Sequence, residues 1–160
     1  MSRKLIMLFL LLTGSVFCFS QGTGQTKIAP FQIRLTSGHM YTASQLAPGP
    51  VVLVYFSPDC DHCQDFTKDL VKNYSVVANK QVVMVTFQPM EMVKPFVTQY
   101  GLASYPNFKV GTEGTTLTVQ KYYQIRSFPY IAIYDKTGKL VRTFEGEQPH
   151  AEIFKALKQI

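Results

Sequence analysis

Cysteine is scarce in this chain of 160 residues. It occurs only three times, at Cys18, Cys60 and Cys63, and tryptophan does not occur at all. So few thiols cannot form the set of disulfides that holds small exported domains together. The sequence therefore predicts a domain that depends on an apolar core, in which one cysteine pair is free to open and close.

Internal repeats, low-complexity stretches and basic clusters are missing too. Sixteen lysines and arginines against ten acidic residues give a formal charge of +6. The basic residues are scattered, however, and do not alternate with aromatic residues, so the composition gives no support for nucleic-acid binding. The length suffices for one domain with a proper core.

The only long apolar run opens the chain and is too short to span a membrane comfortably. Arg3 and Lys4 precede about 15 mostly apolar residues, which as a helix would measure roughly 22 Å against a hydrocarbon core of ~30 Å. Cys18 and Ser20 supply the small residues that export cleavage prefers. We predict a signal peptide at residues 1–20, cleaved after Ser20, and a periplasmic protein. An uncleaved membrane anchor is the alternative.

A Cys-x-x-Cys motif at residues 60–63 lies between a strand pattern and a helix pattern. Residues 51–56 are apolar and mostly β-branched, which indicates a strand buried on both faces. Residues 60–74 carry apolar side chains near helical spacing. Both sulfurs thus fall in the first turn of a helix, where the helix dipole and unpaired N–H groups lower a thiol pKa. This geometry suits disulfide exchange.

The remaining patterns predict strands that alternate with helices. A polar linker at residues 21–29 precedes them. The predicted elements are a hairpin within residues 31–42, strands at 81–87, 105–110, 129–134 and 139–145, a loop at 111–114, and helices at 93–100, 115–123 and from 149 onward. Pro95 is expected in the first turn of its helix. In the strand at 139–145, Leu140, Arg142 and Phe144 are expected to alternate with their neighbours. The order indicates an α/β sandwich with a mixed sheet.

Three blocks of sequence, at residues 53–63, 123–129 and 136–146, resemble the thioredoxin superfamily. More narrowly, they resemble its exported TlpA-like thiol–disulfide oxidoreductases. The helix and strand within residues 89–110 resemble the insertion that separates these proteins from plain thioredoxin. The resemblance implies a thioredoxin-like three-layer sandwich over residues 30–160, with a mixed central sheet, an N-terminal hairpin and the insertion placed before a cis-proline.

The resemblance also implies roles for individual residues. Cys60 is the expected nucleophile and Cys63 the resolving thiol, which releases a partner from the mixed disulfide. Pro129 is the expected cis-proline, which presents the backbone of Phe128 to an incoming substrate and keeps the site from capturing metal. An ordinary proline at the start of a strand is the alternative for Pro129.

The residues around Cys60 act in opposite directions. His62 as a cation would favour the Cys60 thiolate and make the disulfide more oxidising. Asp59 and Asp61 would raise the thiol pKa by like-charge repulsion, so the net effect stays open. Helix capping and compensation of the dipole are the alternative roles for both aspartates.

Two positions depart from the thioredoxin pattern. Asp59 stands where thioredoxin has a tryptophan, and Val54 stands where it has a buried acid that assists proton transfer. Glu91 is a candidate substitute for that acid, although a carboxylate near a helix start also serves as a dipole partner.

We therefore expect an exported thiol:disulfide oxidoreductase that reduces protein disulfides without a cofactor or metal. Its partners would be protein clients and a membrane or periplasmic electron donor. A DsbA-like oxidant is one alternative, because that group has a Cys-x-His-Cys centre. A metal-binding module using Cys60, Cys63 and His62 as soft ligands is another, although no second ligand cluster accompanies them. A peroxiredoxin-type peroxidase would need a proline at Leu53.

Overall fold

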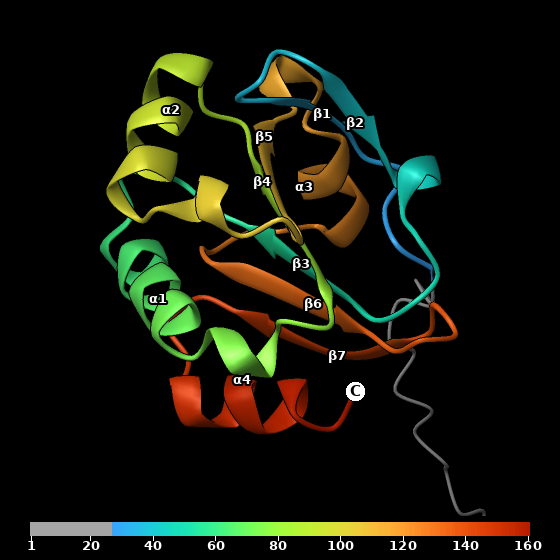
Figure 1. The fold of residues 1–160 in the computed structure, drawn as a ribbon. Helices are drawn as coiled ribbons and strands as arrows, with labels where there is room; N and C mark the ends of the chain where they lie inside the picture. The colour runs from blue at the N-terminus through green and yellow to red at the C-terminus, as the bar shows by residue number, and fades with distance from the viewer. Residues whose placement is uncertain (1–26) are drawn as a thin grey trace, which may run out of the picture.

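The computed structural model describes residues 27–160 (Figure 1). The predicted signal peptide and residues 21–26 of the predicted linker lie outside the described residues. The carbonyl of Lys27 accepts hydrogen bonds from the hydroxyls of Tyr122 at 2.9 Å and Tyr134 at 3.2 Å. The end of the predicted linker is therefore bound to the domain. Between residues 27 and 160, no helix has the length and apolarity needed to cross a bilayer.

Seven strands form one mixed sheet in the order β2-β1-β5-β4-β3-β6-β7. Only β3, β4 and β5 pair in parallel with one another, and the other neighbours are antiparallel. The strands are β1 (Gln32–Leu35), β2 (Met40–Thr42), β3 (Val51–Tyr55), β4 (Gln81–Thr86), β5 (Phe108–Thr112), β6 (Tyr130–Tyr134) and β7 (Leu140–Glu145).

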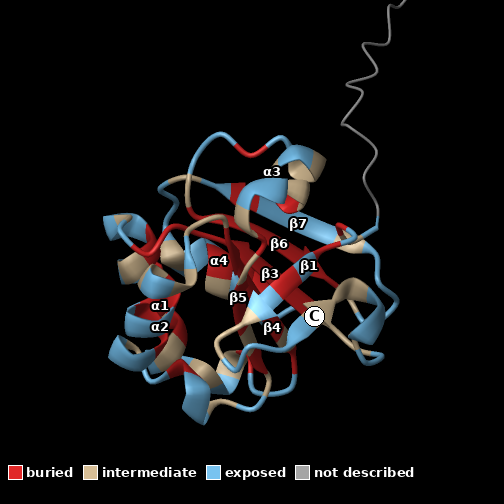
Figure 2. Ribbon diagram, turned by 90° about the horizontal axis from the view of Figure 1, so that it is seen from above, coloured by how far each residue is buried: buried red, intermediate tan, exposed pale blue. Residues whose placement is uncertain are grey.

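Helices cover both faces of this sheet. They are α1 (Asp61–Lys72), α2 (Met90–Gln99), α3 (Thr118–Tyr123) and α4 (His150–Leu157). The apolar sides of α1, α2 and α4 share one core cluster, whereas Val119 of α3 belongs to a second cluster on the opposite face. Figure 2 shows the buried strands between these layers. The predicted thioredoxin-like three-layer sandwich, with its N-terminal hairpin β1–β2, is confirmed.

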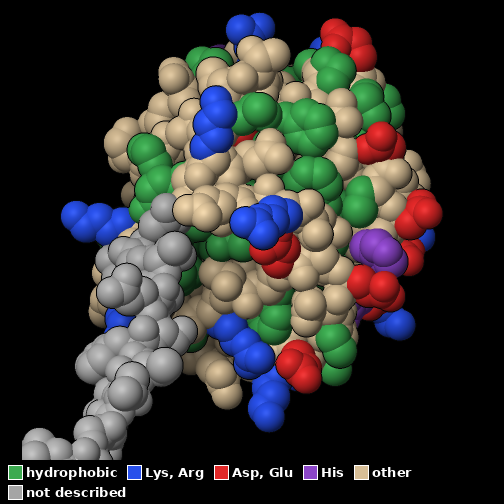
Figure 3. Space-filling model, turned by 180° about the vertical axis from the view of Figure 1, so that it is seen from behind, with side chains coloured by type: hydrophobic (Ala, Val, Ile, Leu, Met, Phe, Trp, Pro, Cys, Tyr) green, Lys and Arg blue, Asp and Glu red, His purple; other side chains and the backbone are tan. Residues whose placement is uncertain are grey.

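The central strands are buried on both sides because their side chains alternate between the two clusters. In β3, Val52 and Val54 contact the cluster beneath α1, while Val51, Leu53 and Tyr55 contact the other cluster. This arrangement explains why β3 is a continuous apolar run rather than an alternating one. On the face seen in Figure 3, lysine and arginine side chains are spread over the surface among side chains of other kinds.

Two local predictions are wrong. Helix α2 begins at Met90, so Pro95 lies inside the helix instead of in its first turn. Strand β5 continues to Thr112 and includes Gly111, which was expected to start a loop. Gly111 fits the strand because β1 approaches its backbone closely. A Cβ atom there would lie 2.4 Å from the carbonyl oxygen of Arg34.

The alternation predicted for the last strand is interrupted. Leu140 contacts the cluster on the α3 face, whereas Phe144 belongs to the cluster on the α1 face. The pairing of β7 with β6 shifts by one residue between Ile133 and Tyr134, which is the mark of a β-bulge. The extra residue moves Leu140 to the other side of the sheet.

Candidate functional site

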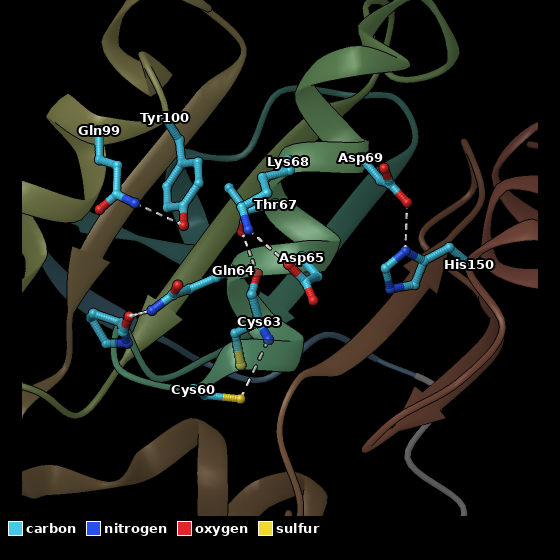
Figure 4. A network of polar contacts seen from close by, with 11 residues as sticks. Cys60, Cys63, Gln64, Asp65, Thr67, Lys68, Asp69, Gln99, Tyr100 and His150 are labelled. Atoms are coloured by element: carbon cyan, nitrogen blue, oxygen red, sulfur yellow. Dashed lines mark hydrogen bonds and ion pairs between the residues drawn. The ribbon is translucent and has the colours of Figure 1, made fainter.

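The Cys-x-x-Cys motif lies where β3 leads into α1. Cys60 is the N-cap residue of the helix, and its sulfur accepts the backbone N–H of Cys63 at 3.4 Å. Figure 4 shows the two sulfurs close together at the start of α1. The predicted position of both cysteines at the beginning of a helix is confirmed. A thiolate at Cys60 would receive both this N–H and the positive end of the helix dipole.

The two sulfurs differ in their contact with solvent. Cys63 is 1% exposed, whereas Cys60 is partly exposed, and both are free thiols. Burial is the main cause that raises the pKa of Cys63, and a hydrogen bond with Cys60 adds to the effect, while a backbone hydrogen bond with Ser57 opposes it. Cys63 therefore stays protonated at neutral pH in this dithiol state.

Phe128 and Pro129 lie directly beside Cys60. The peptide bond between them is cis, as expected, and the thiol of Cys60 donates toward the carbonyl oxygen of Phe128 at 3.9 Å. The Phe128 ring packs against Tyr55 at 5.8 Å and against Phe87 at 5.9 Å between ring centroids. A backbone carbonyl is thus held next to the more accessible sulfur.

The three predicted tuning residues, Asp59, Asp61 and His62, are exposed on the surface around the cysteine turn. The Nε2 atom of His62 lies 3.8 Å from a carboxylate oxygen of Glu147. Asp61 occupies the first turn of α1, where a carboxylate complements the helix dipole. Asp59 accepts a hydrogen bond from the hydroxyl of Ser57, and its charge contributes to the raised pKa of Cys63.

Hollows flank the cysteine turn on two sides. One, of about 310 Å³, is lined by His62, Asp65, Pro129, Gly146, Glu147, Gln148, His150 and Ile153. The other, of about 290 Å³, is lined by Pro58, Asp59, Glu91, Met92, Pro95, Phe96 and Gln99. Glu91, the candidate substitute for a buried acid, is exposed in the first turn of α2. Glu91 therefore lies at the surface, on the rim of the second hollow, and is not a buried acid.

The sequence did not predict two polar features of this region. His150 donates or accepts a hydrogen bond with Asp69 at 2.7 Å and packs on Phe66, which ties α4 to α1 (Figure 4). Glu113 is a buried acid, 6% exposed, at the end of β5. The hydrogen bond between His150 and Asp69 spans 81 positions, and one between Tyr55 and Glu113 spans 58, so no local sequence pattern predicts them. Residues 27–160 contain no cluster of three or more His, Cys, Asp or Glu side chains arranged to hold a metal ion.

Comparison with known proteins agrees with this geometry. Residues 40–160 match the family described as thioredoxin-like domain, and no curated protein matches the chain. A secreted disulfide oxidoreductase of Mycobacterium tuberculosis homologous to E. coli DsbE has a similar structure, with a TM-score of 0.69 at 17% identity over 82% of this chain and 96% of its own.

Two further structures share the fold. A thioredoxin-like protein from Aeropyrum pernix superposes with a TM-score of 0.65 at 17% identity over 82% of this chain and 89% of its own. An exposed lipoprotein thioredoxin from Streptococcus pneumoniae gives 0.57 at 24% identity over 81% and 98%. With the family match covering most of its length, the chain belongs to the thioredoxin-like family of the thioredoxin superfamily.

Proposed function

We propose that this protein is an exported thiol:disulfide oxidoreductase that reduces disulfides of protein clients through Cys60 and Cys63. The observation that carries the proposal is the unequal environment of the two sulfurs. Cys60 is accessible at the start of α1 and receives a backbone N–H, whereas Cys63 is buried directly behind it. This arrangement suits one sulfur for attack and the other for resolution.

The reaction exchanges one disulfide for another. The Cys60 thiolate attacks one sulfur of the client disulfide, so that a mixed disulfide forms and the second client sulfur leaves as a thiolate, which takes up a proton. Cys63 then loses its proton and attacks the Cys60 sulfur. The first client sulfur departs and is protonated, and Cys60 and Cys63 become joined. Two electrons pass to the client, and an electron donor of the membrane or periplasm returns the protein to the dithiol.

Phe128 and Pro129 would orient the client during this exchange. The carbonyl of Phe128 lies beside the Cys60 sulfur, where an extended client segment can pair with the backbone and bring its own sulfur into line. The hollows on both sides of the turn leave room for the side chains that flank the client cysteine.

A reducing role is favoured because few protein groups stabilise a thiolate at Cys60. Strong oxidants of this kind owe their potential to a stabilised reduced form. Among residues 27–160, one backbone N–H, that of Cys63, donates to the Cys60 sulfur, at 3.4 Å. We expect a reduction potential near that of thioredoxin, about −270 mV, whereas a value near about −120 mV would identify an oxidant.

Trapping of covalent adducts tests the assigned roles. Cys63→Ser should accumulate mixed disulfides with clients through Cys60, because the resolving thiol is gone. Cys60→Ser should accumulate none, and the double serine variant serves as the blank. Adducts formed mainly through Cys63 would reverse the assignment. Stoichiometric metal that stays bound to the reduced protein through dialysis would instead support the metal-binding alternative.

A further inference from the structure

Glu113 is a buried acid that has no part in the exchange chemistry described above. It follows β5, is 6% exposed and is paired with no lysine or arginine among residues 27–160. Burying a carboxyl group is costly unless hydrogen bonds compensate for the lost water. An apolar side chain of the same volume could be buried there at a lower free-energy cost, so the presence of a carboxyl group needs an explanation.

Both carboxyl oxygens accept a hydrogen bond, and the two donors belong to different parts of the chain. Oε1 accepts the hydroxyl of Tyr55 at 2.8 Å, and Oε2 accepts the backbone N–H of Val119 at 2.8 Å. Tyr55 is the last residue of β3, which leads into the turn that carries Cys60. Val119 lies in α3, which leads to the loop that carries Phe128 and Pro129.

The segments joined by Glu113 meet again at the reactive sulfur. The Tyr55 ring packs against the Phe128 ring at 5.8 Å, and the carbonyl oxygen of Phe128 lies 3.9 Å from the Cys60 sulfur. The orientation of Tyr55 therefore influences where the Phe128 backbone stands relative to Cys60. Hydrogen bonds to the Tyr55 hydroxyl and to α3 fix that orientation from two sides.

We propose that Glu113 is a positioning residue that sets the Phe128 backbone against Cys60 through Tyr55 and the start of α3. This inference rests on the proposed function, because its consequence is the productive alignment of a client segment. Glu113 touches neither sulfur, so its removal affects docking of the client and leaves the reactivity of the thiolate intact.

Three variants separate positioning from other roles. Glu113→Leu keeps the volume and removes both hydrogen bonds, and Tyr55→Phe removes one of them while keeping the ring on Phe128. Glu113→Gln replaces the carboxyl group with an amide, whose oxygen can accept from Val119 and whose nitrogen can donate to the Tyr55 hydroxyl. Lys80→Met is the matched control, because Lys80 is also buried, at 5% exposure, and precedes β4 at the end of the sheet away from Cys60.

The experiment compares two reactions of each reduced variant. One is exchange with an oxidised peptide that contains a single disulfide, and the other is alkylation of Cys60 by iodoacetamide, which needs no docking. A small misplacement of reacting groups costs up to about a hundredfold in rate, so we expect Glu113→Leu to lose about tenfold or more in kcat/KM for the peptide, mainly through KM, with alkylation changed less than about twofold. Tyr55→Phe should lose less, and Glu113→Gln should restore most of the activity.

Several results would overturn the inference. These are a loss in Glu113→Leu no larger than in Lys80→Met, an equal loss of alkylation, or a Glu113→Gln variant as impaired as Glu113→Leu. If the wild-type protein exchanges with no disulfide, the proposed function fails. Crystal structures of Glu113→Leu and Lys80→Met then decide the positioning role alone, since only the first should displace the Phe128 carbonyl from Cys60.

Discussion

Cys60 and Cys63 occupy very different environments although only two residues separate them. Cys60 is the accessible N-cap of α1, and Cys63, one helical turn further on, lies in the core cluster that contains Phe66. Burial then keeps Cys63 protonated, because its pKa is raised. The proposed division into a reactive and a resolving sulfur thus rests on the helix geometry.

His62→Gln should have little effect on the reduction potential. The imidazole is half exposed, and its Nε2 lies 3.8 Å from Glu147. Exposed charge interactions contribute at most about 1 kcal/mol, which for this two-electron couple corresponds to a shift of at most about 20 mV. Equilibration with glutathione buffers measures the shift, and Glu147→Gln is the control for the surface charge. A shift above about 60 mV would mean that His62 acts directly on Cys60.

Gly111→Ala should destabilise the domain and loosen β1. The new methyl group would lie 2.4 Å from the Arg34 carbonyl oxygen, and backbone cannot move aside without breaking strand pairing. Overpacking of this kind costs about 1–3 kcal/mol. Chemical denaturation of the variant measures the loss of unfolding free energy, with Lys109→Ala in the same strand as control. Unchanged stability would show that β1 can shift freely.

The sequence predicted which helices and strands exist, but it missed several of their boundaries. Strands β3, β4 and β6 are apolar runs closed by turn residues, which local pattern reveals. The end of β5 depends on how closely β1 approaches Gly111, and the facing of Leu140 depends on a bulge. Both are properties of strand pairing, which one segment alone does not encode.

The candidate site also contains both features that the sequence predicted and contacts that only the folded structure shows. Cys60 and Cys63 were predicted because their motif is local in the chain, and Pro129 was predicted from the resemblance to the thioredoxin superfamily. The bond between Glu113 and Tyr55 joins residues 58 positions apart, so only the folded structure brings it to light. Likewise, no sequence pattern could show that His62 faces Glu147.

Pro95→Ala should stabilise the helix α2. Pro95 is the sixth residue of this helix and is exposed, so it removes an internal N–H donor without filling the core. Interior proline costs a helix about 3 kcal/mol relative to alanine, and part of this is offset because proline restricts the unfolded chain by about 1 kcal/mol. We expect a gain in unfolding free energy of about 2 kcal/mol.

Denaturation by guanidinium chloride measures this gain. Lys94→Ala, at the neighbouring exposed position of the same helix, separates the effect of proline from that of surface substitution. A less stable Pro95→Ala protein would contradict the prediction and would indicate that the ring of Pro95 contributes contacts beside the cysteine turn.

For the whole molecule, the two faces of the sheet differ in their buried polar groups. The cluster beneath α3 contains Tyr55, Tyr130 and Tyr134, and Tyr123 packs against it. The hydroxyls of Tyr123 and Tyr134 contact each other at 2.5 Å. Burial is the main cause that raises the pKa of all four tyrosines above the ordinary value of 10.0. These four tyrosines therefore keep their protons at neutral pH and well above it while the protein is folded.

Stability should fall steeply in alkali for this reason. Above about pH 10 the tyrosines ionise in the unfolded chain but stay protonated in the folded one, so the unfolded state binds fewer protons and becomes more stable relative to the folded state as pH rises. Each tyrosine contributes at most about 1.4 kcal/mol per pH unit. Denaturation of the Cys60→Ser/Cys63→Ser protein at pH 8, 10 and 11 isolates the tyrosines from Cys63, whose raised pKa acts in the same direction. Tyr123→Phe should make the decline shallower, and a decline that this variant leaves unchanged would place the titrating groups elsewhere.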